Sequence, residues 1–241
     1  MKVERVEIGP HVLILGDALR VLPTFPSQCA DAVVTDPPYG VGFSRATWPD
    51  DPDQYGNLIS TAVREFNRII VDGWVFVFQG MPNCGRFHEW FPNGWRLFAS
   101  CKNFVQIRPN RIWHAWDPVV FWSNGPCRRP FARINRDYFV ANTAVRRRDK
   151  SHPCPKPIDA MLRIVEMSCA EGGCVLDPFM GQASTGIAAV ALGRRFIGIE
   201  IDRRHFRKAV AAARDAVRRK DAGEELAVGS ARKDIAPRPR S

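Results

Sequence analysis

Short apolar runs that end in an acid, a glycine or a proline recur along the chain and predict the buried strands of a sheet. They are HVLILGDA at 11–18, ADAVVTDPP at 30–38, DGWVFVFQG at 72–80, GGCVLDPFMG at 172–181 and RRFIGIEID at 194–202. Strands that are apolar throughout are typical of parallel sheets covered on both faces. The chain is therefore expected to contain a mostly parallel sheet.

Helical spacing of apolar residues appears between these runs. In 55–70, for example, Leu58, Ala62 and Phe66 share one face. Helices are expected within 18–29, 55–70, 157–170, 184–193 and 203–220. Strands that alternate with helices predict a doubly wound α/β fold, in which ligands bind beyond the carboxyl ends of the strands near the switch in strand order.

The middle and the end of the chain read differently. The aromatic-rich stretch 87–125 is interpreted as antiparallel strands, with DPVVFW at 117–122 the clearest, and 123–150 is basic without a clear period. The tail 221–241 has little apolar content and is expected to stay mobile. We expect a single domain over 1–220.

Composition narrows the class of protein. The 241 residues are 45% hydrophobic with a net charge of +10, which suggests a globular protein with a polyanionic partner such as nucleic acid, or a charge excess that serves solubility. The start of the chain does not resemble a signal peptide, and we expect no membrane span. Seven scattered cysteines without a C-x-x-C pair indicate reduced thiols in the cytoplasm and no metal site.

The segment from 174 to 202 has the order of a cofactor-binding unit: strand, glycine-containing turn, helix, and a strand that ends in an acid. Glu200 follows Asp177 by 23 positions, about where an acid binds a ribose in dinucleotide-type folds. The turn reads G-Q-A at 181–183 rather than G-x-G, which disfavours NAD. S-adenosylmethionine, which has a sugar and no phosphate, fits better; the alternative is an ordinary βαβ unit with Asp177 as a helix N-cap.

Four motifs carry a family resemblance. DPPYG at 36–40 resembles the catalytic motif of the DNA amino-methyltransferases, which methylate adenine-N6 or cytosine-N4. VLDPFMG followed by RRFIGIEID resembles their S-adenosylmethionine motif, HPCPKP at 152–157 their H-P-x-x-K-P, and LILGDAL at 13–19 their G-D-A segment. The order, catalytic motif first, resembles the β-group of these enzymes.

The resemblance implies a Rossmann-like methyltransferase fold, with a mostly parallel sheet, one antiparallel strand and a short basic target-recognition insertion at about 123–150. It implies the catalytic residues Asp36, Pro37, Pro38 and Tyr39. It implies cofactor contacts from Asp17, Ala18, Asp36, Lys156, Asp177, Phe179, Gly181 and Glu200. The family usually has glycine where this chain has Ala183, and alanine resists a positive φ, so weakened cofactor binding is expected.

The double proline has a physical reason in this chemistry. The lone pair of an exocyclic amine is delocalised into the base, and two acceptors placed against its N–H bonds would localise it. The Asp36 carboxylate and the Pro37 carbonyl are such acceptors, held rigid by fixed proline torsions. Tyr39 would stack on a base extruded from the duplex, and transfer from sulfonium to nitrogen would be direct.

Basic and aromatic residues between 123 and 150 are the candidate DNA contacts. The arginines are Arg128, Arg129, Arg133, Arg136, Arg146, Arg147 and Arg148. They could bind phosphates or guanine, while Phe131, Tyr138 and Phe139 could stack on bases; a solvated basic loop is the alternative. We expect a short recognition site in double-stranded DNA or a homodimer that contributes two surfaces. His114 and Asp117 resemble the family's H-x-x-E-P strand, with a structural hydrogen bond expected there.

The sequence therefore predicts a solitary or phage-type DNA methyltransferase, related to the enzymes of restriction–modification systems, that acts on adenine-N6 in the prokaryotic cytoplasm or nucleoid. Asp36 favours adenine, because cytosine-N4 enzymes more often have serine there. The alternatives are cytosine-N4 methylation, a noncatalytic DNA-binding protein on the same scaffold, and an RNA or protein substrate. Cytosine carbon-5 chemistry at the Pro-Cys dipeptides of Cys127 or Cys154 would leave DPPYG without a role.

Overall fold

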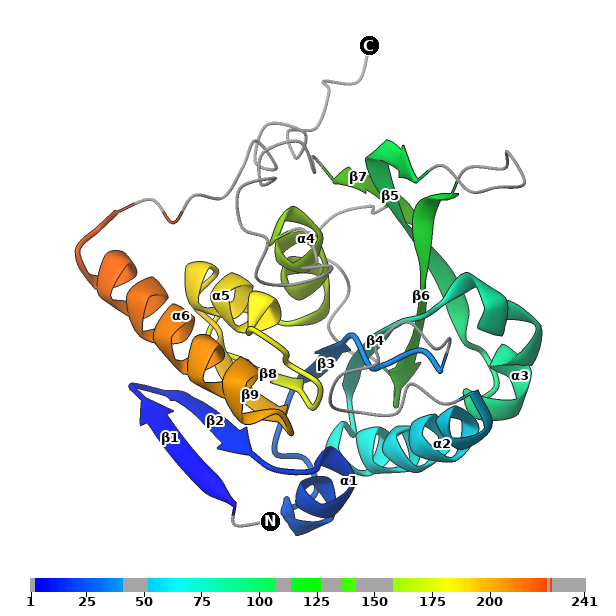
Figure 1. Ribbon diagram of the computed structural model, residues 1–241, viewed down its shortest axis with the longest axis horizontal. Helices are drawn as coiled ribbons and strands as arrows, with labels where there is room; N and C mark the ends of the chain where they lie inside the picture. The colour runs from blue at the N-terminus through cyan, green and yellow to red at the C-terminus, as the bar shows by residue number, and fades with distance from the viewer. Residues whose placement is uncertain are drawn as a thin grey trace.

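A nine-stranded sheet forms the centre of the molecule (Figure 1). The computed structural model describes residues 3–40, 52–106, 114–126, 136–141, 158–224 and 226. The strands are β1 (Glu4–Ile8), β2 (His11–Leu15), β3 (Ala32–Thr35), β4 (Gly73–Phe78), β5 (Arg96–Gln106), β6 (His114–Asn124), β7 (Tyr138–Ala141), β8 (Cys174–Asp177) and β9 (Arg195–Glu200). The α-helices are α1 (Ala18–Val21), α2 (Pro52–Ile69), α3 (Phe87–Trp90), α4 (Ile158–Ser168), α5 (Ser184–Ala191) and α6 (Arg203–Asp221), and the 3-10 helices are η1 (Leu22–Thr24) and η2 (Met81–Arg86).

The strand order is β1-β2-β9-β8-β3-β4-β6-β5-β7. Strands β2, β9, β8, β3 and β4 are parallel, and β7 is parallel to β5. Strand β1 is antiparallel to β2, and β6 is antiparallel to both β4 and β5. The mostly parallel α/β sheet is thus confirmed, but two of the described strands oppose the rest where one was expected. The additional strand, β1, has mainly exposed and charged positions, so it does not read as a buried run.

The aromatic-rich stretch contains the expected antiparallel pair, β5 and β6. Its beginning is different: Phe87–Trp90 is a helical turn rather than a strand. Phe87 and Trp90, three residues apart, are both buried, and the Trp90 ring meets Tyr55 of α2 edge-on with centroids 5.2 Å apart. Packing against α2 therefore overrides the strand preference of these aromatics.

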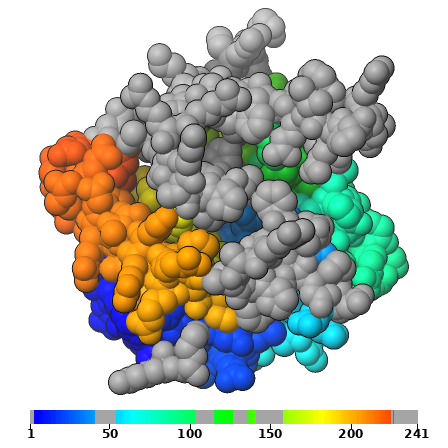
Figure 2. Space-filling view, in the orientation of Figure 1, coloured from blue at the N-terminus to red at the C-terminus, as the bar shows by residue number. Residues whose placement is uncertain are grey.

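Helices cover both faces of the sheet (Figure 1). Val33, Val75 and Leu176 face the layer of α1, α2 and α3, whereas their neighbours Val34 and Phe76 face the layer of α4, α5 and α6. In the space-filling view of the same side, α6 lies on one flank and α3 on the other (Figure 2). Each apolar strand is thus buried on both faces, as its sequence predicts.

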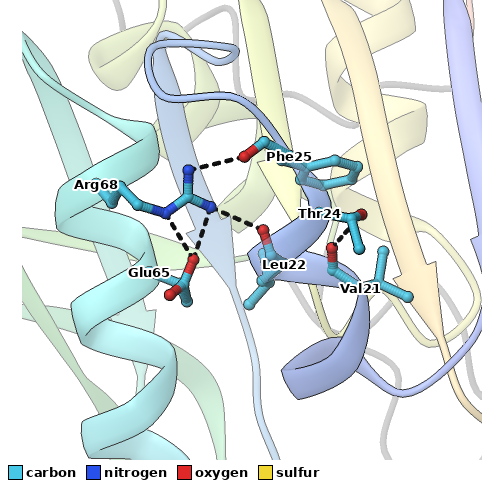
Figure 3. Close-up of polar contacts among 6 residues, drawn as sticks. All are labelled: Val21, Leu22, Thr24, Phe25, Glu65 and Arg68. Carbon is cyan, nitrogen blue, oxygen red and sulfur yellow. Dashed lines mark hydrogen bonds and ion pairs between the residues drawn. The ribbon is translucent and has the colours of Figure 1, made fainter.

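Arg68 of α2 contacts the segment of the 3-10 helix η1 (Figure 3). Its guanidinium donates hydrogen bonds to the Phe25 carbonyl at 2.7 Å and to the Leu22 carbonyl at 2.9 Å. Glu65, one turn earlier in α2, pairs with the same guanidinium at 2.7 Å. The Leu22 carbonyl also accepts from the Phe25 amide at 3.1 Å, so Arg68 is a second donor there, and its contacts link α2 to the segment before β3.

The chain changes sides at the boundary between β8 and β3. From β3 the chain passes through α2 to β4, and from β8 it passes through α5 to β9; these two helices cover opposite faces. The neighbouring strands β3 and β8 therefore form the switch in strand order, where α/β sheets bind ligands. Asp36 and Asp177 lie at this position, one directly after β3 and one at the end of β8.

The expected domain boundary and tail fall at the end of α6. That helix ends at Asp221, and Leu226 is buried against Val190 and Ala216. Residues 227–241, which make up most of the predicted tail, lie outside the described residues. Packing contacts thus continue a few residues past 220.

Candidate active site

The DPPYG turn begins where β3 ends. Pro37 is buried, while Asp36 and Tyr39 are half-buried. The Tyr39 hydroxyl donates a hydrogen bond to the Asp36 carboxylate, and the Tyr39 carbonyl accepts one from the Asn83 side chain at 2.8 Å. The turn is therefore held at both its backbone and its side chains.

Gly80, two residues after β4, provides the space for Tyr39. A Cβ at this position would lie 3.1 Å from the Tyr39 Cβ and 3.3 Å from its ring. Burial raises the pKa of the Tyr39 phenol well above its usual value, and the adjacent Asp36 raises it further. Tyr39 therefore remains a neutral hydrogen-bond donor at physiological pH.

Asp177 connects the two motifs across the switch point. Its buried carboxylate accepts hydrogen bonds from the Thr35 hydroxyl at 2.7 Å and from the Phe179 amide at 3.1 Å. Burial raises its pKa to about 6, these hydrogen bonds act against the rise, and the charge of Asp36 adds to it. The alternative role of Asp177 as a helix N-cap is wrong, because the N-cap position of α5 is Ala183.

The turn after β8 has an unusual backbone. Gly181 has a φ of +54° and Ala183 a φ of +64°. The Ala183 amide donates to the Met180 carbonyl at 2.7 Å, and the Met180 amide donates to the Ile199 carbonyl at 3.0 Å. Alanine thus adopts the left-handed conformation that the sequence suggested it would resist.

Glu200 ends β9 beside the same turn. It is 9% exposed, and its carboxylate accepts hydrogen bonds from the Asp202 amide at 2.7 Å and from the Gly181 amide. Burial raises its pKa to about 7 in spite of these hydrogen bonds. The Glu200 carbonyl accepts from the Gly16 amide at 2.9 Å, which brings the 16–18 segment alongside.

Asp17 and Ala18 begin α1 at this edge of the sheet. Asp17 is the N-cap, and its carboxylate accepts a hydrogen bond from the Leu19 amide at 3.0 Å. Ala18 is buried, and Phe179 is half-buried against the same core layer. The structure therefore brings together all the predicted catalytic residues and every predicted cofactor residue except Lys156, which lies outside the described residues.

Two further pairs in the site were not predicted as pairs from the sequence, although a structural hydrogen bond was expected for Asp117. Lys102 of β5 and Asp117 of β6 form an ion pair at 2.7 Å, and Asp117 is close enough to Tyr39 to raise the pKa of its phenol. Asp117 thus has the expected structural hydrogen bond. Tyr55 of α2 donates to the Gln79 side chain at 2.7 Å. A polar residue directly after an apolar strand, as in WVFVFQG, was the available signal for Gln79.

Most of the predicted DNA-binding residues lie outside the described part of the chain: Arg128, Arg129, Arg133, Arg146, Arg147 and Arg148. Arg136 is described and exposed. Its guanidinium lies 5.7 Å from the centre of the Tyr138 ring and donates to the Tyr138 hydroxyl at 2.9 Å. Tyr138 begins β7, an edge strand of the sheet, and Arg136 lies two residues before it.

Across the described residues, no three His, Cys, Asp or Glu side chains are grouped so that they could hold a metal ion. In the same part of the chain, no helix has the length and hydropathy needed to span a membrane.

A Rossmann-like α/β fold with two acidic motifs at its switch point defines a methyltransferase architecture, and comparisons with known proteins agree. Residues 106–211 match a family model described as DNA methylase. The chain is 40% identical to the DNA adenine methyltransferase YhdJ of Escherichia coli over 81% of this chain and 80% of that protein. The chain therefore belongs to the N6/N4 family of S-adenosylmethionine-dependent DNA methyltransferases, which confirms the family and the cofactor expected from the sequence.

Solved structures show the same fold at lower identity. The PvuII cytosine-N4-specific DNA methyltransferase superposes with a TM-score of 0.67 at 17% identity, over 88% of this chain and 93% of that one. The M1.HpyAVI–SAM complex superposes with a TM-score of 0.64 at 21% identity, over 83% of this chain and 97% of that one. The expected Rossmann-like methyltransferase fold is thus confirmed.

Proposed function

We propose that this protein transfers a methyl group from S-adenosylmethionine to the exocyclic N6 amine of adenine in double-stranded DNA. The observation that carries the proposal is the placement of Asp36 and Pro37 at the switch point, next to Asp177 across the Thr35 hydrogen bond. An aspartate in this motif and the 40% identity to a protein named DNA adenine methyltransferase support adenine.

The residues on the cofactor side fit a ligand that has a ribose and a cationic amino acid. Glu200, 9% exposed and at the end of β9, would accept hydrogen bonds from the ribose hydroxyls. Asp177 and the turn through Gly181 would hold the methionine part, with Asp17 and Ala18 near the adenine ring and Lys156 reaching the carboxylate. When bound, the cofactor supplies an electrophilic methyl group on a positively charged sulfur.

The acceptors of the DPPYG turn activate the amine. Asp36 and the Pro37 carbonyl would each accept one N–H of the target amine, which localises its lone pair toward the methyl carbon. A nitrogen–carbon bond then forms as the sulfur–carbon bond breaks; sulfur keeps the electron pair, and the amine loses one proton to Asp36 or solvent. The Tyr39 hydroxyl donates to Asp36 in this structure. Because a carboxylate accepts several hydrogen bonds, the amine would bind Asp36 beside it, with the Tyr39 ring stacked on the extruded base.

DNA binding is proposed for the basic segment 123–150. The exposed pair of Arg136 and Tyr138 at the start of β7 offers a cation and an aromatic face, which suit phosphate and base contacts respectively. The arginines outside the described residues would add phosphate contacts, so that binding weakens steeply with salt. A homodimer would supply a second such surface.

The test is direct product analysis. Unmethylated DNA is incubated with the protein and S-adenosylmethionine, digested to nucleosides and analysed by mass spectrometry, with Asp36→Ala as the control. We expect N6-methyladenine with the wild type and a loss of at least 100-fold in rate with Asp36→Ala, whose fold should persist. N4-methylcytosine as the only product would overturn adenine, and equal, negligible transfer by both proteins would favour a noncatalytic DNA-binding protein.

A further inference from the structure

Gln79 carries a buried amide whose donor is unused. It follows β4 directly, it is 1% exposed, and its backbone N–H donates to the Pro118 carbonyl at 2.8 Å. Its side-chain oxygen accepts a hydrogen bond from the Tyr55 hydroxyl at 2.7 Å. Throughout the described part of the chain, no group accepts a hydrogen bond from its Nε2. A buried unpaired donor costs stability, so its presence calls for a functional reason.

The position of Gln79 relates it to the catalytic turn. In the parallel register of β3 and β4, Thr35 pairs with Val77, and continuing that register by two residues sets Pro37 beside Gln79. The next residue, Gly80, backs onto the Tyr39 ring. Tyr55, which holds the Gln79 amide, is also close enough to Tyr39 to affect its phenol electrostatically. The strand register and the Gly80–Tyr39 contact thus place Gln79 next to the DPPYG turn, which carries the acceptors proposed for the base amine.

The target base offers a matching acceptor. In adenine, the carbon that bears the amine is also bonded to N1, an unprotonated ring nitrogen, and cytosine has the same arrangement at C4 and N3. Thymine and guanine instead carry an N–H at the corresponding ring position beside their exocyclic carbonyl. A fixed amide donor next to the two amine acceptors thus suits adenine or cytosine and meets a second donor in the other two bases.

We propose that Gln79 donates a hydrogen bond from Nε2 to the ring nitrogen beside the target amine of the extruded base. This inference rests on the proposed methyl transfer to a base amine and adds a residue that selects and orients that base. Tyr55 acts as a positioning residue, because its hydroxyl holds the Gln79 amide with the NH₂ group directed away from itself. A site built to hydrogen-bond a substrate atom discriminates strongly against an analogue that lacks the atom.

The experiment removes the hydrogen bond from each side in turn. The recognition sequence is first mapped by methylation-sensitive sequencing of treated DNA, and synthetic duplexes are made with adenine or 1-deazaadenine at the target position; 3-deazacytosine serves if the product is N4-methylcytosine. For the wild type, we expect kcat/KM to fall at least about tenfold on the deaza duplex. For Gln79→Leu, we expect a similar loss with the natural base and no more than about a twofold further loss on the deaza duplex.

The ratio of kcat/KM on the natural duplex to kcat/KM on the deaza duplex decides the outcome. Any intrinsic effect of the deaza ring on the amine appears in both proteins and cancels, whereas a hydrogen bond from Gln79 appears in the wild type alone. If Gln79→Leu and the less branched Gln79→Met show the wild-type ratio, the inference is overturned. Tyr55→Phe should give a ratio between those of the wild type and Gln79→Leu. This variant tests the inference even if both Gln79 variants fail to fold. Failure of the proposed function is distinct: the wild type would then methylate no target base.

Discussion

Ala183 shows how a single residue can hold a costly backbone conformation at the cofactor turn. Its φ of +64° and ψ of +38° are left-handed, and its side chain is fully buried. For a residue with a Cβ, this conformation costs about 1–2 kcal/mol relative to glycine, whereas burial of the methyl group returns about 0.8 kcal/mol. The strain therefore exceeds what the methyl contributes.

Replacing Ala183 by glycine should consequently stabilise the protein. We expect the free energy of unfolding of Ala183→Gly to rise by about 0.5 kcal/mol, measured by urea denaturation. The matched control is Ala188→Gly, an equally buried alanine within α5, which should lose about 1–2 kcal/mol because the helix interior disfavours glycine. A loss of stability at Ala183 comparable to that at Ala188 would contradict the strain argument.

The buried carboxyls of Asp177 and Glu200 make stability depend on pH. Their pKa values rise from 3.8 to about 6 and from 4.5 to about 7, so the folded chain binds more protons than the unfolded chain between these limits. Stability then falls as pH rises wherever the folded state holds the extra proton. The contribution of these two groups therefore declines from about pH 4 to about pH 7 and is constant above that.

Cofactor affinity should show the opposite trend, because a ribose hydroxyl donates best to an ionised carboxylate. With a pKa of about 7, Glu200 is mostly protonated at pH 6 and mostly ionised at pH 8. We expect the Kd for S-adenosylmethionine to be roughly tenfold higher at pH 6 than at pH 8 by calorimetry. Glu200→Gln should bind more weakly at pH 8 and with little dependence on pH; an unchanged pH profile in this variant would assign the titration to another group.

At the scale of the elements, the connection between α2 and the segment before β3 depends on one side chain. Arg68 donates to the carbonyls of Leu22 and Phe25, and removing it leaves both without this partner. Arg68→Ala should therefore lower the free energy of unfolding by about 1–3 kcal/mol in urea denaturation. Arg64→Ala, an exposed arginine one turn earlier in the same helix, should change it by less than about 0.5 kcal/mol. Equal effects of the two substitutions would show that the carbonyl contacts of Arg68 do not stabilise the fold.

The elements that could be predicted are those whose local pattern agrees with their burial. The parallel strands β2, β3, β4, β8 and β9 read as apolar runs because helices cover both of their faces. Three elements were not predicted, because their burial or packing cannot be read from their own sequence. Strand β1 is largely exposed, β7 is a short edge strand inside a basic segment, and α3 is helical because Trp90 packs on Tyr55.

Over the whole molecule, the site is assembled from motifs that are far apart in the chain. The Thr35 hydroxyl reaches the Asp177 carboxylate across 142 positions of sequence. The motifs themselves could be recognised because each is a short strand-and-turn pattern with a defined order. The pair of Tyr55 with Gln79 could not, since it depends on how α2 packs at the end of β4, and the pair of Lys102 with Asp117 could not, since it depends on the register of β5 and β6.

The place of the N-terminal hairpin has a consequence for how this fold can vary. Strand β1 lies at the sheet edge next to β2, and Glu4 forms an ion pair at 2.9 Å with Arg203 at the beginning of α6, the last described helix. Strands β3 to β7 come from one continuous stretch of chain, and β8 and β9 from another that pairs with β2. A circular permutation that begins the polypeptide with the cofactor half and ends it with the catalytic half keeps the same strand order, and so the same active centre.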